Sequence, residues 1–139
     1  GLLDWADFAA VEARIANLLS AAGVKTDATV ACPFHPDHTA GYDQSHAQWR
    51  KPGPELLTTV ADRLNIDLAN SWLIGDQKRD LESARHAGLA GGILIGAVLP
   101  TDGGPSREDL SQRGFTFRDL RSAKNALAAL QETDLFNSQ

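Results

Sequence analysis

Two aspartates follow a short apolar run near the middle of the chain. Residues 72–74 have the pattern of a buried strand, Gly75 allows a sharp turn, and Asp76 falls at the carboxyl end of the strand. Ligands of open α/β sheets bind beyond these strand ends, and Asp76 with Asp80 offers the oxygen ligands that Mg²⁺ prefers. A structural interpretation stays open, in which Asp76 caps the next helix and Asp80 lies in its first turn, where the helix dipole favours anions.

A pair of cations, Arg50 and Lys51, directly precedes Pro52 and a helix that begins near Pro54. Cationic side chains and the free N–H groups of a helix N-terminus both attract anions, so the pair is a candidate phosphate site. A solvated basic pair at the end of a loop is the alternative, because such dipeptides are common on protein surfaces.

A third candidate is the loop that carries Cys32, His35, His38 and His46. Thiolate and imidazole groups are zinc ligands, but the spacing here is irregular and the chain has no second cysteine. We therefore expect solvated histidines in this loop and no zinc site.

The first helical pattern begins at Asp4, a good N-cap residue that resembles a capping box together with Asp7, and it ends near Gly23. A nucleophilic aspartate at a strand end needs a buried strand before it, and the only apolar side chains before Asp4 are Leu2 and Leu3. We interpret Asp4 and Asp7 as helix-capping residues.

Strands and helices alternate along the rest of the chain, which predicts a mostly parallel α/β sheet. The expected elements, in order, are a strand at 27–32, a polar loop at 33–48, a helix at 54–64, a strand at 72–74, a helix from Asp80 to Gly88, a strand at 91–95, a loop at 96–104, a helical turn at 107–112, a short edge strand at 115–117 and a last helix capped by Asp119 or Ser122.

Composition limits the class of protein. The chain has 139 residues, which suits one domain spanning 1–139, and its formal net charge of −5 argues against nucleic acid or an anionic membrane as a partner. It has one cysteine, and we expect neither a signal peptide nor a membrane span, because no stretch of the sequence has either pattern. We expect a reducing, cytoplasmic location.

The order of these pieces resembles the haloacid dehalogenase (HAD) superfamily. The segments concerned are Arg50-Lys51-Pro52, the helix after it, Ile74 to Asp80 and Ala87-Gly88. Cys32 to Pro36 is similar to a loop of the branch that holds heptose bisphosphate and histidinol-phosphate phosphatases. The resemblance covers roughly residues 1–120 and implies a three-layer HAD-like fold.

The resemblance implies a phosphomonoesterase for small sugar phosphates such as D-glycero-D-manno-heptose 1,7-bisphosphate. In that family an aspartate attacks phosphorus, a second aspartate is the general acid, and Mg²⁺ with a lysine neutralises the phosphoryl oxygens. By this resemblance Asp76 is the Mg²⁺ ligand and Arg50 contacts the substrate phosphate. Lys51 is the family lysine, and Asp80 is a supporting carboxylate that acts through a metal-bound water or through the lysine.

The chain departs from the family's zinc-binding members. Those members carry Cys-x-His and Cys-x-Cys in the loop, and Cys32 fits the first position. Phe34, Ala47 and Trp49 stand at the three other ligand positions. We expect a zinc-free loop, held by its own turns and by packing of Tyr42 and Trp49.

The chain also lacks the family's first strand with its Asp-x-Asp and the second, phosphate-binding strand. These two strands should lie between the strand at 27–32 and the strand at 72–74. We expect the missing segment in a longer natural protein, in another chain, or replaced by intermolecular pairing. Two hypotheses follow: the metal- and lysine-bearing part of a phosphatase, inactive alone, or a non-catalytic module that binds a phosphorylated ligand or assembles with another chain.

Overall fold

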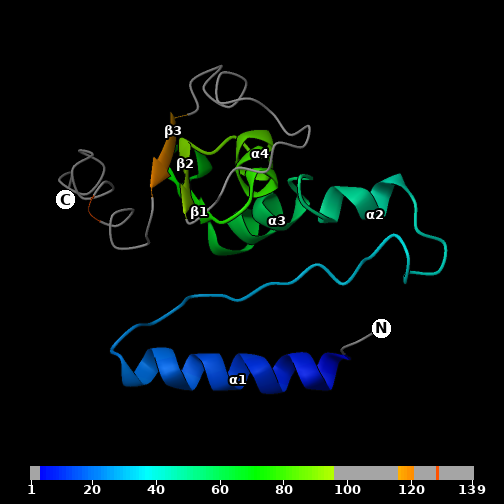
Figure 1. Cartoon of the computed structure of the whole chain (residues 1–139), viewed down its shortest axis with the longest axis horizontal. Helices are drawn as coiled ribbons and strands as arrows, with labels where there is room; N and C mark the ends of the chain where they lie inside the picture. The colour runs from blue at the N-terminus through cyan, green and yellow to red at the C-terminus, as the bar shows by residue number, and fades with distance from the viewer. Residues whose placement is uncertain (1–3, 96–115, 121–127, 129–139) are drawn as a thin grey trace.

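A computed structural model describes residues 4–95, 116–120 and 128 of the chain. The helices are α1 (Trp5–Ala21), α2 (Gln44–Trp49), α3 (Glu55–Leu64), the short 3₁₀ helix η1 (Leu68–Asn70) and α4 (Lys78–His86). The strands are β1 (Trp72–Gly75), β2 (Gly91–Ile95) and β3 (Thr116–Leu120). Figure 1 shows α3, α4 and the strands gathered together, with α1 set apart from them.

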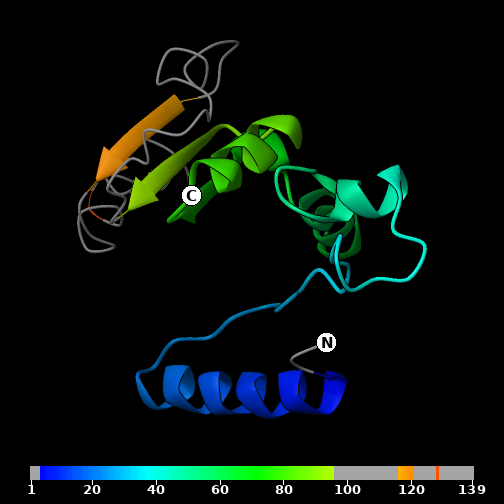
Figure 2. The same ribbon diagram turned by 45° about the vertical axis from the view of Figure 1, so that its right-hand side comes forward.

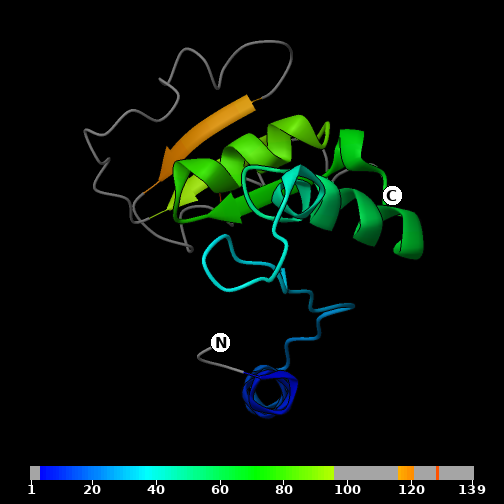
Figure 3. The ribbon, with the colours of Figure 1, turned by 90° about the vertical axis from the view of Figure 1, so that its right-hand side faces the viewer.

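The three strands form one parallel sheet in the order β1-β2-β3. Leu81 and Leu94 are fully buried and pack with Leu73, so α4 is joined to β1 and β2 by a small apolar core. Figure 3 shows α4 lying along one face of the sheet. The prediction of a parallel α/β sheet is confirmed, and the carboxyl end of β1 lies close to the start of α4.

The helix expected at Asp4 forms as predicted. Asp4 accepts a hydrogen bond from the N–H of Asp7, and the side chain of Asp7 accepts one from the N–H of Asp4. No residue of α1 is buried, however, and its apolar side chains Val11, Ile15 and Leu18 are 42–53% exposed. The turned views agree that α1 lies apart from the sheet (Figures 1 and 2).

The strand predicted at 27–32 does not form. This segment is extended and almost wholly exposed, and within the described residues it pairs with no strand. β-branched residues favour extended backbone, but a strand also needs a neighbour to accept its ladder hydrogen bonds. The prediction was wrong because no such neighbour lies beside this segment in the described part of the chain.

The segment 33–48, predicted as a polar loop, contains a short helix, α2, that was not predicted. Asp43 caps it, and its carboxylate accepts hydrogen bonds from the N–H groups of Ser45 and His46 at 2.9 and 3.3 Å. A six-residue helix is too short to show a clear apolar period, so only its cap could have revealed it.

The remaining boundaries differ in smaller ways. Helix α3 follows Pro54 as expected, whereas α4 starts two residues before Asp80, at Lys78. Strand β3 extends the strand expected at 115–117 to Leu120, so Asp119 lies in a strand and caps no helix. The loop predicted at 96–104, the helical turn at 107–112 and the alternative cap Ser122 lie outside the described residues.

Candidate active site at the end of strand β1

Strand β1 delivers Asp76 to the carboxyl edge of the sheet. Asp76 is exposed and follows Gly75, the last residue of the strand. The capping interpretation of Asp76 is wrong, because Gln77 is the N-cap residue of α4. The Asp76 carboxylate is therefore not used by the helix and remains available to a ligand.

Asp80 lies behind this edge and is 3% exposed. Its Oδ2 accepts a hydrogen bond from the N–H of Gln77 at 3.0 Å, as expected for an acidic residue in the first turn of a helix. Its Oδ1 accepts one from the Nζ of Lys51 at 2.5 Å. Of the two roles that the family resemblance offered, the geometry favours the contact to the lysine.

Gly75 makes room for Asp80. A Cβ atom at position 75 would lie 2.5 Å from Cβ and 2.6 Å from Oδ2 of Asp80, closer than real Cβ atoms approach. The sequence suggested a turn here, but Gly75 belongs to β1 and is required for close approach. Any side chain at this position would push the Asp80 carboxylate away from Lys51.

Lys51 reaches this edge from the loop between α2 and α3. Its side chain is 53% exposed, whereas the side chain of Asp80 is 5% exposed. The ion pair thus joins two residues that are 29 positions apart and brings a solvent-facing cation to the end of β1. This is the arrangement expected for a group that meets an anionic ligand from solvent.

Arg50 is the C-cap residue of α2 and is partly buried. Its N–H donates to the carbonyl oxygen of Ala47 at 3.1 Å, which fixes its backbone. Among the described residues its guanidinium forms no ion pair with a carboxylate. A role in binding substrate phosphate stays a prediction for this residue.

Aromatic packing holds the histidine-containing loop. The ring of Phe34 packs against His46 and Trp49 with centroids 4.5 and 6.5 Å apart, and Tyr42 stacks on His46 at 5.7 Å. The expected packing of Tyr42 and Trp49 is confirmed.

In the part of the chain that the structure describes, no group of three or more side chains is placed to hold a metal ion. This applies to the candidate zinc ligands Cys32, His35, His38 and His46. The Sγ of Cys32 instead donates to the carbonyl oxygen of Phe34 at 3.6 Å. The rings of His35 and His38 lie against each other with centroids 4.8 Å apart. That the loop binds no stoichiometric zinc stays a prediction, which metal analysis tests.

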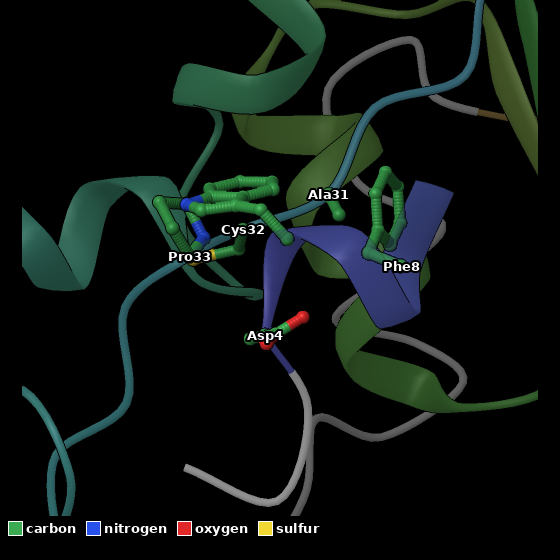
Figure 4. A pocket seen from close by; sticks show the side chains of 6 residues that line it. Asp4, Phe8, Ala31, Cys32 and Pro33 are labelled. Carbon is green, nitrogen blue, oxygen red and sulfur yellow. The ribbon is translucent and has the colours of Figure 1, made fainter. Parts of the chain in front are cut away.

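A pocket of about 270 Å³ lies between the start of α1 and residues 31–33. In Figure 4 the ring of Phe8 stands on one side of it, and Cys32 and Pro33 stand on the other. None of Arg50, Lys51, Asp76 and Asp80 lines this pocket, so it is separate from the candidate site.

Comparison with known proteins finds a matching family model and similar proteins. A family model described as HAD-hydrolase-like matches residues 48–123. A D-glycero-beta-D-manno-heptose-1,7-bisphosphate 7-phosphatase of Mesorhizobium japonicum is 34% identical over 134 residues, which cover 94% of this chain and 57% of the relative. The enzyme of the same name from Pseudomonas aeruginosa is 35% identical over 128 residues, covering 91% of this chain and 66% of the relative.

A solved structure is also similar. The D,D-heptose 1,7-bisphosphate phosphatase of B. bronchiseptica, complexed with magnesium and phosphate, aligns with a TM-score of 0.67 and 32% identity, over 96% of this chain and 68% of that protein. The chain spans about half the length of the curated relatives it matches. Because the family model matches more than half of the sequence and the fold agrees, the chain belongs to the HAD-like hydrolase family.

Proposed function

We propose that this chain carries the lysine and metal-binding part of a Mg²⁺-dependent phosphomonoesterase. Its substrate would be a small sugar phosphate such as D-glycero-D-manno-heptose 1,7-bisphosphate, the compound named for its relatives. The observation that carries the proposal is the ion pair of Lys51 and Asp80 near the carboxyl end of β1. Asp76 directly follows the last residue of this strand. A solvent-facing cation and a free carboxylate at one strand end suit a metal-bound phosphate ester.

The donor groups at this edge fit Mg²⁺. The ion binds through one or two carboxylates and keeps several waters, and Asp76 presents an exposed carboxylate of this kind. Asp80 is buried, and both its oxygens already accept hydrogen bonds, so Asp76 would be the direct ligand and Asp80 a support. When bound, Mg²⁺ would polarise a phosphoryl oxygen of the substrate.

The charged side chains of the loop would do the rest of the binding. The Lys51 ammonium would stabilise negative charge on the transferring phosphoryl group, and Arg50 would hold the substrate phosphate. The paired carboxylate of Asp80 keeps the flexible lysine side chain at the site between substrate encounters. These groups bind and stabilise, but none of them attacks phosphorus.

We propose that the nucleophile comes from another segment than the one that carries these groups. Asp4 and Asp7 are occupied by their mutual capping box at the start of α1. Within the described residues, β1 has a strand neighbour on one side only, and Ile74 on it is 43% exposed. We propose that an added strand bearing Asp-x-Asp, from the same protein or another chain, pairs with this edge, because an unpaired edge accepts another strand readily.

The capping of Asp4 and Asp7 also keeps a second candidate open. A non-catalytic module could use the same Lys51 and Arg50 to bind a phosphorylated ligand, or use its open sheet edge to assemble with another chain. In either case the single cysteine, Cys32, makes the reducing cytoplasm the proposed location.

Phosphate release separates the two functions. Heptose 1,7-bisphosphate is incubated with Mg²⁺ and either the chain alone or a form extended upstream by a segment ending in Asp-x-Asp. The enzyme proposal predicts negligible release by the chain alone and clear release by the extended form, most of it lost in Lys51→Ala. An extended, folded form that binds phosphate and releases none would support the non-catalytic module. Turnover by the chain alone that is lost in Asp76→Asn would place the nucleophile within this sequence.

A further inference from the structure

Helix α4 presents three polar side chains to the loop that carries Lys51. Asp80, Ser83 and His86 are spaced three residues apart, so they follow one another along one side of the helix. Each binds a different residue of the loop 51–53. The ion pair of Asp80 with Lys51 is therefore one of three adjacent contacts between α4 and this loop.

Ser83 fixes the far end of the loop. It is 2% exposed, and its Oγ donates a hydrogen bond of 2.8 Å to the carbonyl oxygen of Gly53. On the other side Gly53 lies against α2, where a Cβ atom would collide with the carbonyl group of Gln48. Gly53 is thus confined between two helices, and the buried hydroxyl of Ser83 satisfies its carbonyl group.

His86 holds the middle of the loop. Its Nδ1 lies 2.9 Å from the carbonyl oxygen of Pro52, which can only accept, so Nδ1 carries the proton and donates it. Its Nε2 lies 3.4 Å from the guanidinium of Arg85, which can only donate. The Pro52 carbonyl requires a proton on Nδ1, so a ring that carries this proton is the form that binds the loop.

Neither contact involves the side chain of Lys51. A lysine side chain has four flexible methylenes, and this one is 53% exposed, so its own packing does not determine where the ammonium lies. The position of the loop backbone sets the distance that the side chain must span to Asp80. A shift of the loop by about 1 Å would be enough to weaken such a pair, and errors of this size are costly in active sites.

We propose that Ser83 and His86 are positioning residues that hold the backbone of loop 51–53 so that the Lys51 ammonium stays on Asp80 at the mouth of the phosphate site. The importance of this position for phosphate rests on the proposed function. The effect of Ser83 and His86 on the position of Lys51 is independent of the proposed function.

The test observes the Lys51 ammonium directly. The chain has four lysines, so ¹⁵N labelling of lysine gives few side-chain ammonium signals, and Lys51→Arg identifies the one required. An ammonium held by a carboxylate exchanges its protons slowly. In Ser83→Ala and in His86→Ala we expect this exchange to accelerate about fivefold, the factor that corresponds to one lost hydrogen bond.

Matched variants exclude a general structural effect. Ser71→Ala removes a similar hydroxyl-to-carbonyl hydrogen bond, of 2.6 Å to Asp67, that does not touch the loop, and it should leave the Lys51 signal unchanged. His86→Gln keeps a donor at an exposed position and should restore slow exchange. Unchanged exchange in folded His86→Ala would overturn the proposal, and so would equal acceleration in Ser71→Ala.

Titration with inorganic phosphate in the presence of Mg²⁺ separates this inference from the proposed function. If Ser83→Ala and His86→Ala accelerate exchange but phosphate never perturbs the Lys51 signal, the positioning role stands and the phosphate site fails. If phosphate perturbs the signal equally in the wild-type chain and in both variants, with unchanged exchange, the phosphate site stands and the positioning role is overturned.

Discussion

At the scale of single residues, the site depends on small groups placed next to charged ones. Gly75 has no side chain, and the Asp80 carboxylate occupies the space that a Cβ would need. Asp80 in turn pairs with Lys51, so a glycine of strand β1 influences a lysine of the loop between α2 and α3. Gly75 lies in an ordinary strand, so its backbone conformation does not require glycine. Glycine is required because the Asp80 side chain approaches so closely.

Gly75→Ala should destabilise the chain by about 1–3 kcal/mol, the usual cost of an added group in a packed site. The expected cause is collision with Asp80, so the same change in an Asp80→Ala background should cost clearly less. Urea unfolding of the four proteins of this cycle measures both quantities. Equal costs in the two backgrounds would show that the two positions are independent.

Asp76→Asn should weaken Mg²⁺ binding by about tenfold or more, because it removes the charge of an exposed carboxylate at the end of β1. Calorimetric titration of the two chains measures the change. Asp62→Asn, which alters an exposed aspartate of α3, is the matched control and should bind Mg²⁺ as the wild type does. Equal affinity in the Asp76 variant would remove this residue from the metal site.

At the scale of elements, short helices here are held by their ends. Helix α2 has six residues and depends on its cap Asp43, whose pKa is lowered from 3.8 to about 2. The hydrogen bond from the Ser45 hydroxyl is the main cause, and bonds from His46 add to it. Because these bonds favour the ionised form, the folded cap resists protonation more than the unfolded chain does.

The stability that this cap contributes should be fully present above about pH 4 and should be lost as the pH falls toward 2. The sign follows from the lowered pKa, since protons bind the unfolded chain first. The carboxyl ¹³C shift of Asp43 can be followed by NMR from pH 6 to pH 1, a range of about five pH units that includes both pKa values. Its midpoint should lie near the lowered pKa of about 2. In Ser45→Ala the midpoint should rise, and an unchanged midpoint there would contradict the assigned cause.

The loop before α2 should bind less than stoichiometric zinc, because Phe34, Ala47 and Trp49 occupy three ligand positions of the zinc-binding relatives that the sequence resembles. Elemental analysis of protein purified without added metal measures this. Near-stoichiometric zinc that disappears in Cys32→Ser would instead give His35, His38 or His46 the missing roles.

At the scale of the whole molecule, the buried core and the long helix are separate. The fully buried apolar residues lie in β2 and α4, whereas α1 buries none of its residues, and no helix in the described part is long and apolar enough to cross a membrane. The exposed apolar side chains of α1, and the pairing of β1 on one side only within the described residues, both suit the proposed added strand. Pairing at β1 would complete the sheet, and burial of α1 would follow.

Ile93→Ala should destabilise the chain by about 2–4 kcal/mol, because Ile93 is fully buried in β2. Ile15→Ala makes the same chemical change at a position that is 42% exposed, and it should cost well under about 1 kcal/mol in the chain alone. Urea unfolding compares the two. Similar costs would mean that α1 is buried in solution, by association or by packing that the isolated chain acquires.

The sequence by itself determined the local structure and the identity of the candidate groups. The capping box of Asp4 and Asp7 follows from residue types and spacing, because it depends on neighbours along the chain. The apolar run before Asp76 indicated β1, and the alternation of strand and helix patterns indicated the parallel sheet. The family resemblance of the sequence also indicated Lys51 and Asp76 as candidate site residues.

Only the tertiary structure decided which groups meet. The pairing of Lys51 with Asp80, the contacts of Ser83 and His86 with the same loop and the need for glycine at 75 join residues about 30 positions apart, or concern space that spacing cannot describe. The extended segment at 27–32 also shows that residue types alone do not decide the structure. Its residue types favour a strand, but a strand exists only where another backbone lies beside it, and that is a property of the fold.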